Sequence, residues 1–146
     1  WWRHWTSGAA SGQMLVVDAS CLFEVVADTP RSGEIAARLA AEVEQAAPHV
    51  IDVEVMGLIR AQHLRGQLDG TAAAQAVADL RDWPGERVGH RWLLERAWQL
   101  RDSIRGWDAL YVALAEVFDA TLLTLDARLA RAHGRTCRIE VLGARD

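Results

Sequence analysis

Residues 121–130, TLLTLDARLA, change from a strand pattern to a helical pattern at a single aspartate, Asp126. The aliphatic and β-branched run before it is typical of a buried strand, and aspartate is favoured just before a helix. The same arrangement occurs near the start of the chain, where the run 14–17 is followed by Asp18 and by a helical pattern that opens at Ser20. Two such units far apart in the chain indicate parallel β-α units in one sheet.

The residues between these two units alternate helical patterns with short strand patterns. Pro48, Gly66 and Pro84 stand where helices are expected to end, and the run 108–117 is apolar on nearly all sides, which predicts a helix inside the core. We therefore expect a helix-rich α/β fold, a three-layer α/β/α open parallel sheet. The expected strands are 14–17, 87–90, 121–125 and 139–142, and the expected helices start at Ser20 and span 31–46, 51–65, 71–83, 91–102, 108–117 and 127–132.

The length of 146 residues, with 51% hydrophobic and 25% charged residues, predicts one folded domain. Residues 1–13 combine clustered tryptophans with a Ser/Gly/Ala run, so we interpret them as a tag or linker and assign the domain to 14–146. No stretch approaches the roughly 18 apolar residues of a membrane span, so we expect a cytoplasmic protein without a membrane partner. Cys21 and Cys137 lack metal-site spacing and are expected to be reduced thiols.

The charged residues exclude several classes of protein. A net charge of −4 argues against a general polyanion binder. All sixteen basic residues are arginine, whereas response-regulator receivers and haloacid-dehalogenase-type phosphatases both require a lysine beside an acidic pocket. Those phosphatases also need a second aspartate where this chain has Ser20, and no Gly-x-Gly-x-x-Gly motif for a dinucleotide follows the first strand.

Four acidic residues are candidates for a single site: Asp18, Glu54, Asp108 and Asp126. Asp18 and Asp126 follow strands, whose carboxyl ends meet at the ligand-binding edge of an open parallel sheet. Asp108 begins an expected helix, and Glu54 lies in the first turns of another. Each acid alone is explained as well or better by helix capping, but four in one small chain favour a shared pocket.

Clustered carboxylates repel one another, and such a group is stable mainly when a cation neutralises it. Hard oxygen ligands select Mg²⁺ or Mn²⁺. A divalent ion in this position would activate water and bind phosphate oxygens. The sequence therefore predicts a metal-dependent nuclease.

Four motifs in order resemble the PIN-domain ribonucleases, specifically the VapC-type toxins of bacterial toxin–antitoxin systems. They are Val16-Val17-Asp18-Ala19-Ser20, the segment 54–60 (EVMGLIR), the run 107–116 (WDALYVALAE) and the segment 122–130 (LLTLDARLA). The resemblance covers residues 14–142, and the run around Asp108 is the most specific part of it. One position departs from the pattern, because many relatives carry asparagine where this chain has Gly57.

The resemblance implies an Mg²⁺- or Mn²⁺-dependent endoribonuclease that cleaves structured cellular RNA of the tRNA or rRNA class. It also implies a cognate VapB-type antitoxin that inhibits the enzyme, and a homodimer. Asp18, Glu54, Asp108 and Asp126 are carried over as catalytic metal ligands. The alternative is a PIN-like module that binds RNA or a protein without cleaving.

Further residues are candidates for supporting roles. Ser20 and Thr124 are candidates to orient Asp18 and Asp126, with helix capping an equal alternative for Ser20. Arg105, Arg128 and Arg131, together with Arg135 and Arg138, are candidates for phosphate contacts, against the alternative of a solvated surface. No histidine has ligand spacing, and the tryptophans at 83, 92, 98 and 107 are expected to fill the core or an interface rather than to stack on bases. A partner helix is expected to dock near Phe23 and Val26 or on the helix at 31–46.

Overall fold

The computed structural model describes residues 2, 14–41 and 44–143. Five parallel strands form one sheet in the order β3-β2-β1-β4-β5. The strands are β1 (Leu15–Val17), β2 (Gln45–Pro48), β3 (Glu86–Val88), β4 (Thr121–Thr124) and β5 (Arg138–Val141). The helices are α1 (Ala19–Val26), α2 (Ser32–Ala40), α3 (Val50–Leu64), α4 (Gly70–Asp82), the 3₁₀ turn η1 (Arg91–Leu93), α5 (Leu94–Gln99), α6 (Asp108–Val117) and α7 (Ala127–Ala130).

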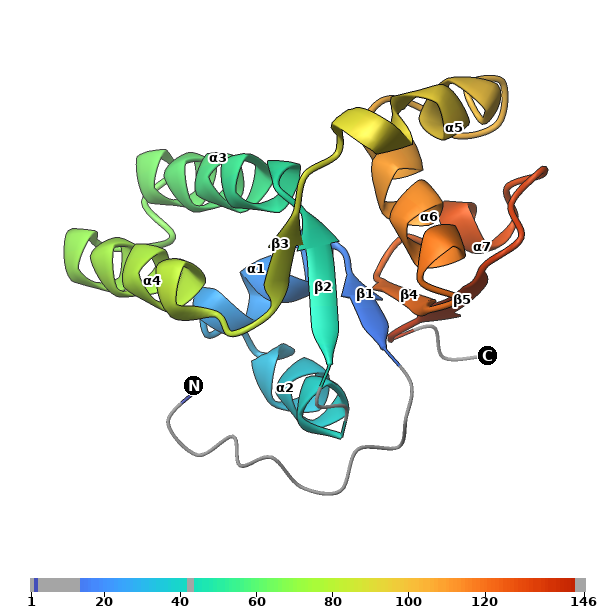
Figure 1. The fold of residues 1–146 in the computed structure, drawn as a ribbon. Coiled ribbons are helices and arrows are strands. Elements are labelled where there is room, and N and C mark those ends of the chain that lie inside the picture. Colours follow the sequence, from blue (N-terminus) through green and yellow to red (C-terminus); the bar gives the residue numbers. More distant parts are fainter. Residues whose placement is uncertain (1, 3–13, 42–43, 144–146) are drawn as a thin grey trace.

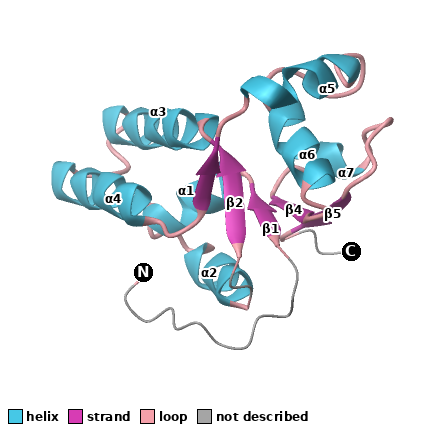
Figure 2. Ribbon diagram, in the orientation of Figure 1, coloured by secondary structure: helices cyan, strands magenta, loops and turns pink. Residues whose placement is uncertain are grey.

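The helices cover both faces of the sheet (Figures 1 and 2): α1 to α4 lie on one side, and α5 to α7 lie on the other. This arrangement follows from strand order, because right-handed crossovers that run from β1 toward β3 place their helices on the face opposite to crossovers that run toward β5. The direction reverses between β1 and β4, and the crevice beyond the ends of those strands is the usual ligand site of such sheets. The expected three-layer α/β/α fold is confirmed.

Buried aliphatic side chains hold the layers together. All three residues of β1 are buried, and helix α6 is buried from Ala109 through Ala115, as its apolar sequence predicted. Since α6 contacts β1, β2 and β4, it fixes the position of Asp108 at its first turn relative to the middle of the sheet. Packing of the core thus sets the geometry at the crevice.

The expected helix at 31–46 was wrong at its C-terminal end. Helix α2 ends at Ala40, and residues 45–48 form the strand β2, while residues 42 and 43 lie outside the described part of the chain. Alanine has a low strand propensity, but Ala46 and Ala47 are completely buried between neighbouring strands. Pro48 pairs only with Val88, beyond the last β1–β2 pair, so its missing N–H is compatible with the ladder.

The other expected elements are confirmed with small shifts. The expected strand at 87–90 is β3 at 86–88, and the helix expected at 91–102 begins as a 3₁₀ turn and ends at Gln99. Of the expected tag, residues 1 and 3–13 lie outside the described residues, and Trp2 donates from its indole Nε1 to the Asp79 carbonyl at 2.7 Å. None of the helices in the described part of the chain has the length and apolarity that a membrane crossing requires.

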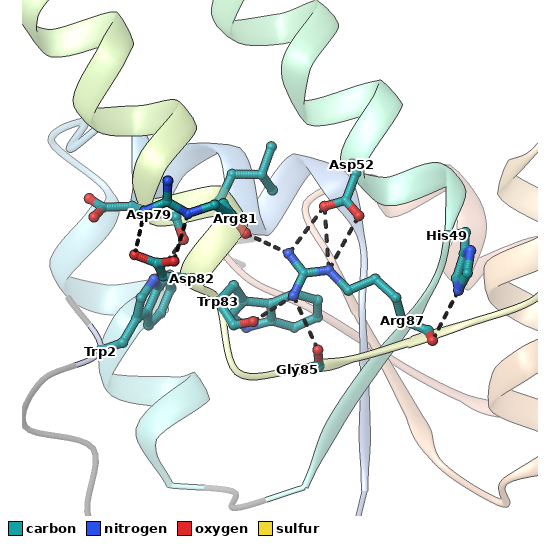
Figure 3. Close-up of polar contacts among 10 residues, drawn as sticks. Trp2, His49, Asp52, Asp79, Arg81, Asp82, Trp83, Gly85 and Arg87 are labelled. Carbon is teal, nitrogen blue, oxygen red and sulfur yellow. Dashed lines mark hydrogen bonds and ion pairs between the residues drawn. The ribbon is translucent and has the colours of Figure 1, made fainter.

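Arg87 joins three elements around the turn between α4 and β3 (Figure 3). Its guanidinium donates to the Asp52 carboxylate of α3 at 3.1 Å and to the carbonyls of Leu80, Trp83 and Gly85, and it lies 5.0 Å from the centre of the Trp83 ring. Asp52 is two residues before Glu54. The planar fork of arginine donors therefore ties the first turns of α3 to the edge of the sheet.

Candidate active site

A cavity of about 700 Å³ lies at the carboxyl ends of β1 and β4, and all four predicted acids line it. Asp18 follows β1, Glu54 lies on α3, Asp108 begins α6 and Asp126 precedes α7. These acids come from both halves of the chain, and the reversal of strand order brings them to one crevice. The structure therefore agrees with the expectation that the acids share a pocket.

Asp18 is the most enclosed of the four, at 7% exposure. Its Oδ2 accepts hydrogen bonds from Thr124 Oγ1 at 2.6 Å and from Ser20 Oγ at 3.0 Å. Burial raises the pKa of this carboxyl, although the two hydroxyls oppose the shift. The same hydroxyls accept backbone N–H groups, since Leu125 donates to Ser20 and Asp126 donates to Thr124. The predicted supporting residues thus join the strand ends in one network.

The Glu54 carboxylate accepts a hydrogen bond from a tyrosine of α6. Tyr111 is completely buried in α6, and its hydroxyl donates to Glu54 Oε1 at 2.8 Å. Burial raises the pKa of Glu54 to about 7, and the charges of Asp18 and Asp108 add to the shift while the tyrosine hydroxyl opposes it. Near neutral pH this carboxyl is therefore only partly ionised, because its surroundings disfavour the charged form.

The Asp108 carboxylate accepts no hydrogen bond from the described residues, although the Arg105 and Arg128 charges act on it. Burial, followed by repulsion from Asp18 and Asp126, raises the pKa of its carboxyl. Three carboxylates that face one cavity therefore have raised pKa values, which is the condition that a bound cation would relieve.

Asp126 differs from the other three. Its carboxylate caps α7 by accepting from the Arg128 backbone N–H at 2.9 Å, and it pairs with the Arg128 guanidinium at 2.9 Å. Hydrogen bonding with Arg128 lowers its pKa. Helix capping thus accounts for Asp126. It does not account for Asp18, which stands at the start of α1 without a capping hydrogen bond from its side chain.

The donor set fits a divalent cation by chemistry and charge. Carboxylate oxygens are the ligands that Mg²⁺ and Mn²⁺ prefer, and Mg²⁺ normally keeps several waters and takes only a few protein ligands. Within the described residues, no three acids, histidines or cysteines are already grouped closely enough to hold an ion. An ion at this cavity would therefore be held by few direct carboxylate contacts, with water in the remaining positions.

The predicted arginines divide into two groups. Arg105 and Arg128 line the cavity, whereas Arg131 does not. Arg135 donates to the carbonyls of Ala130 and Cys137, and Arg138 donates to Thr121 Oγ1, so both have contacts that support the β4–β5 connection.

Two sequence interpretations need revision. Tyr111 was not singled out, although its place in the run Asp108-Ala109-Leu110-Tyr111, one helical turn after an acid, was a usable signal. The expected docking surface offers few exposed apolar side chains, because Phe23 and Val26 are 9% and 4% exposed and the large apolar side chains of α2, Ile35 and Leu39, are buried. Exposed apolar side chains occur instead on α3 and around α5.

The chain is similar to known proteins over most of its length. A model of the PIN domain matches residues 15–134. Ribonuclease VapC12 of Mycobacterium tuberculosis is 36% identical over 129 residues, which cover 88% of this chain and 99% of that protein. Ribonuclease VapC3 of the same species is 40% identical over 121 residues, which cover 82% and 88%.

Among solved structures, a chain of VapBC2 from Rickettsia felis, bound to a DNA fragment from its promoter, has the same fold. The TM-score is 0.63 at 14% identity, and the match covers 88% of this chain and 98% of that one. The length of the match to the family model and the identity to curated relatives are sufficient to assign the family. This chain belongs to the PIN-domain family and, within it, to the VapC ribonucleases.

Proposed function

We propose that this protein is an Mg²⁺- or Mn²⁺-dependent endoribonuclease toxin that is neutralised by a cognate VapB-type antitoxin. The observation that carries the proposal is the cavity shared by Asp18, Glu54, Asp108 and Asp126, three of which have raised pKa values from burial and mutual repulsion. Clustered carboxylates of this kind repel one another and destabilise the fold, whereas an enzyme that binds a cation uses them as ligands.

The residues of the chain have separate tasks in this proposal. Asp18, Glu54 and Asp108 would hold the ion, directly or through its bound water, and Asp126 would either join them or keep its pairing with Arg128. When bound, the ion supplies activation of water and neutralisation of phosphate charge. Thr124 and Ser20 fix the orientation of Asp18 through their hydroxyls.

The arginines of the cavity rim suit a phosphodiester substrate. Arg105 and Arg128 line the cavity beside the acids, and guanidinium groups bind phosphate oxygens with directional hydrogen bonds. They would hold the phosphate next to the carboxylates although the net charge of the chain is negative.

The substrate class and the partners rest on the family. Relatives named as ribonucleases support an RNA substrate, and the resemblance in the motifs favours structured RNA of the tRNA or rRNA class. The Rickettsia felis structure is a VapBC complex, which supports a VapB-type partner here. A homodimer and a cytoplasmic location complete the proposal.

The test is cleavage of total RNA by the purified protein with Mg²⁺ or Mn²⁺, compared with EDTA and with an Asp18→Asn variant. Asp119→Asn is a matched control, since Asp119 is an exposed acid that does not line the cavity. We expect cleavage by wild type and by the control, and none by Asp18→Asn. Equal cleavage by all three proteins would indicate a contaminating nuclease, and no cleavage by any of them would favour a non-cleaving binding module. Sequencing of RNA 5′ ends would then identify the bond cut.

A further inference from the structure

A second hollow of about 530 Å³ lies beside the carboxylate cavity, between α5 and the beginning of α6. Leu94, Trp98, Trp107, Arg101 and Arg105 are among the residues that line it. We call it the tryptophan groove. Its wall is mainly aliphatic and aromatic, and none of the described residues that line it is acidic.

The tryptophan groove is continuous with the carboxylate cavity. Arg105, Gly106 and Trp107 line both of them. Trp107 directly precedes Asp108 in the chain, so one of the two tryptophans is the sequence neighbour of a candidate metal ligand. A polymer whose phosphate lies at the carboxylates would therefore continue directly into the groove.

The two indoles are unusually accessible for such large apolar groups. Trp98 is 67% exposed and Trp107 is 58% exposed. The Arg101 guanidinium lies over the Trp98 ring, 4.5 Å from its centre, and donates to the Trp98 carbonyl at 2.9 Å. Accessible aromatic rings with adjacent guanidinium groups form the kind of surface on which unpaired bases stack while cations contact the backbone.

We propose that the tryptophan groove is a nucleotide subsite, in which a base next to the cleaved phosphodiester stacks on Trp98 or Trp107 while Arg101 and Arg105 contact the flanking phosphate. The inference rests on the proposed ribonuclease function and deepens it, because it requires an unstacked base beside the cut bond. The two arginines and the continuity with the carboxylate cavity favour RNA over a protein occupant. A protein in the groove would have to leave both guanidinium charges unpaired or supply acidic groups that neutralise them.

Binding in EDTA tests the subsite without cleavage. The probes are fluorescein-labelled ten-nucleotide oligoadenylate RNA and an abasic phosphodiester oligomer of the same length, measured by fluorescence anisotropy. At least one of Trp98→Leu and Trp107→Leu is expected to weaken oligoadenylate binding at least fivefold, since stacking on an aromatic side chain is worth ~1 kcal/mol or more per base, and both are expected to leave abasic binding unchanged. Trp92→Leu is the control, because Trp92 is 54% exposed and does not line the groove.

Two further variants keep the result decisive if a leucine variant fails to fold. Trp98→Phe retains an aromatic face and should bind oligoadenylate within about twofold of wild type. Arg101→Gln should weaken both probes, because the phosphate contact does not depend on a base.

Oligoadenylate binding that is the same in wild type and both leucine variants would overturn the subsite. So would a change from dimer to monomer in the leucine variants with unchanged RNA affinity, which would make the groove an interface between copies. Failure of the proposed function gives a different result, namely no metal-dependent cleavage by wild type.

Discussion

Replacing Glu54 by glutamine is expected to stabilise the metal-free protein at alkaline pH while it weakens metal binding. The pKa of Glu54 is raised from 4.5 to about 7 by burial and neighbouring acids. The folded protein thus binds a proton that the unfolded chain releases between pH 4.5 and 7, and stability contributed by this group falls as pH rises through that window. Glutamine keeps the Tyr111 hydrogen bond without the charge.

The magnitude follows from the size of the shift. A rise in pKa from 4.5 to about 7 corresponds to at most about 3.4 kcal/mol. Glu54 is partly exposed, so screening by solvent lowers the expectation to roughly 1.5–3 kcal/mol at pH 8. For a domain of this size we expect a rise in Tm of about 3–10 °C.

The assay is thermal unfolding in EDTA at pH 5 and pH 8, repeated with excess Mn²⁺. Glu54→Gln should match wild type at pH 5 and exceed it at pH 8, and Mn²⁺ should raise the Tm of wild type more than that of the variant. Glu86→Gln, which removes an exposed acid outside the cavity, controls for net charge. Identical Tm differences between variant and wild type at both pH values would refute the account of burial and repulsion.

Three other predictions follow from single contacts. Thr124→Val should lower Mg²⁺-dependent cleavage 10- to 100-fold because Asp18 loses its shortest hydrogen bond. Thr124→Ser should keep most of the activity. Equal cleavage rates for the valine variant and wild type would contradict the orienting role. Gly57→Ala should raise the free energy of unfolding by ~0.5–1 kcal/mol in urea titrations, since the position is helical and a methyl group there meets nothing within 4 Å. A free energy of unfolding below that of wild type would mean that this face of α3 packs against another chain. Cys21 and Cys137 should react with Ellman's reagent at pH 8 only after unfolding, because both are buried and burial raises their pKa, that of Cys137 to about 11. Rapid reaction of either thiol in the native protein would show that the segment around it opens.

The sequence was sufficient for the fold where pattern and packing agree. The two strand–aspartate–helix units predicted β1 and β4, and the nearly all-apolar run 108–117 predicted a helix of the right length in the core. The sequence pattern did not predict β2. The alanines of that strand are small residues that fit between neighbouring strands, and local strand propensity does not encode this fit. Gln45 could not be interpreted either, although its amide bonds Trp83 across 38 positions of the chain.

The site was predictable in its acids and less so in their partners. Acids at the ends of strands converge because of sheet topology, which the order of elements already implied. The Tyr111 contact with Glu54 depends on how α6 lies against α3, and the separation of Arg105 from Arg131 depends on loop geometry. Such contacts join segments distant in the chain, and no local pattern reports them.

The reversal of strand order between β1 and β4 has a consequence for variants of this domain. The crevice there is produced by the path of the chain, and the aliphatic residues that stabilise the sheet lie elsewhere. Chemistry and folding are thus assigned to different side chains. A variant that loses one of the four acids is therefore expected to keep the fold, so that its loss of cleavage would report on the chemistry of the crevice and not on unfolding.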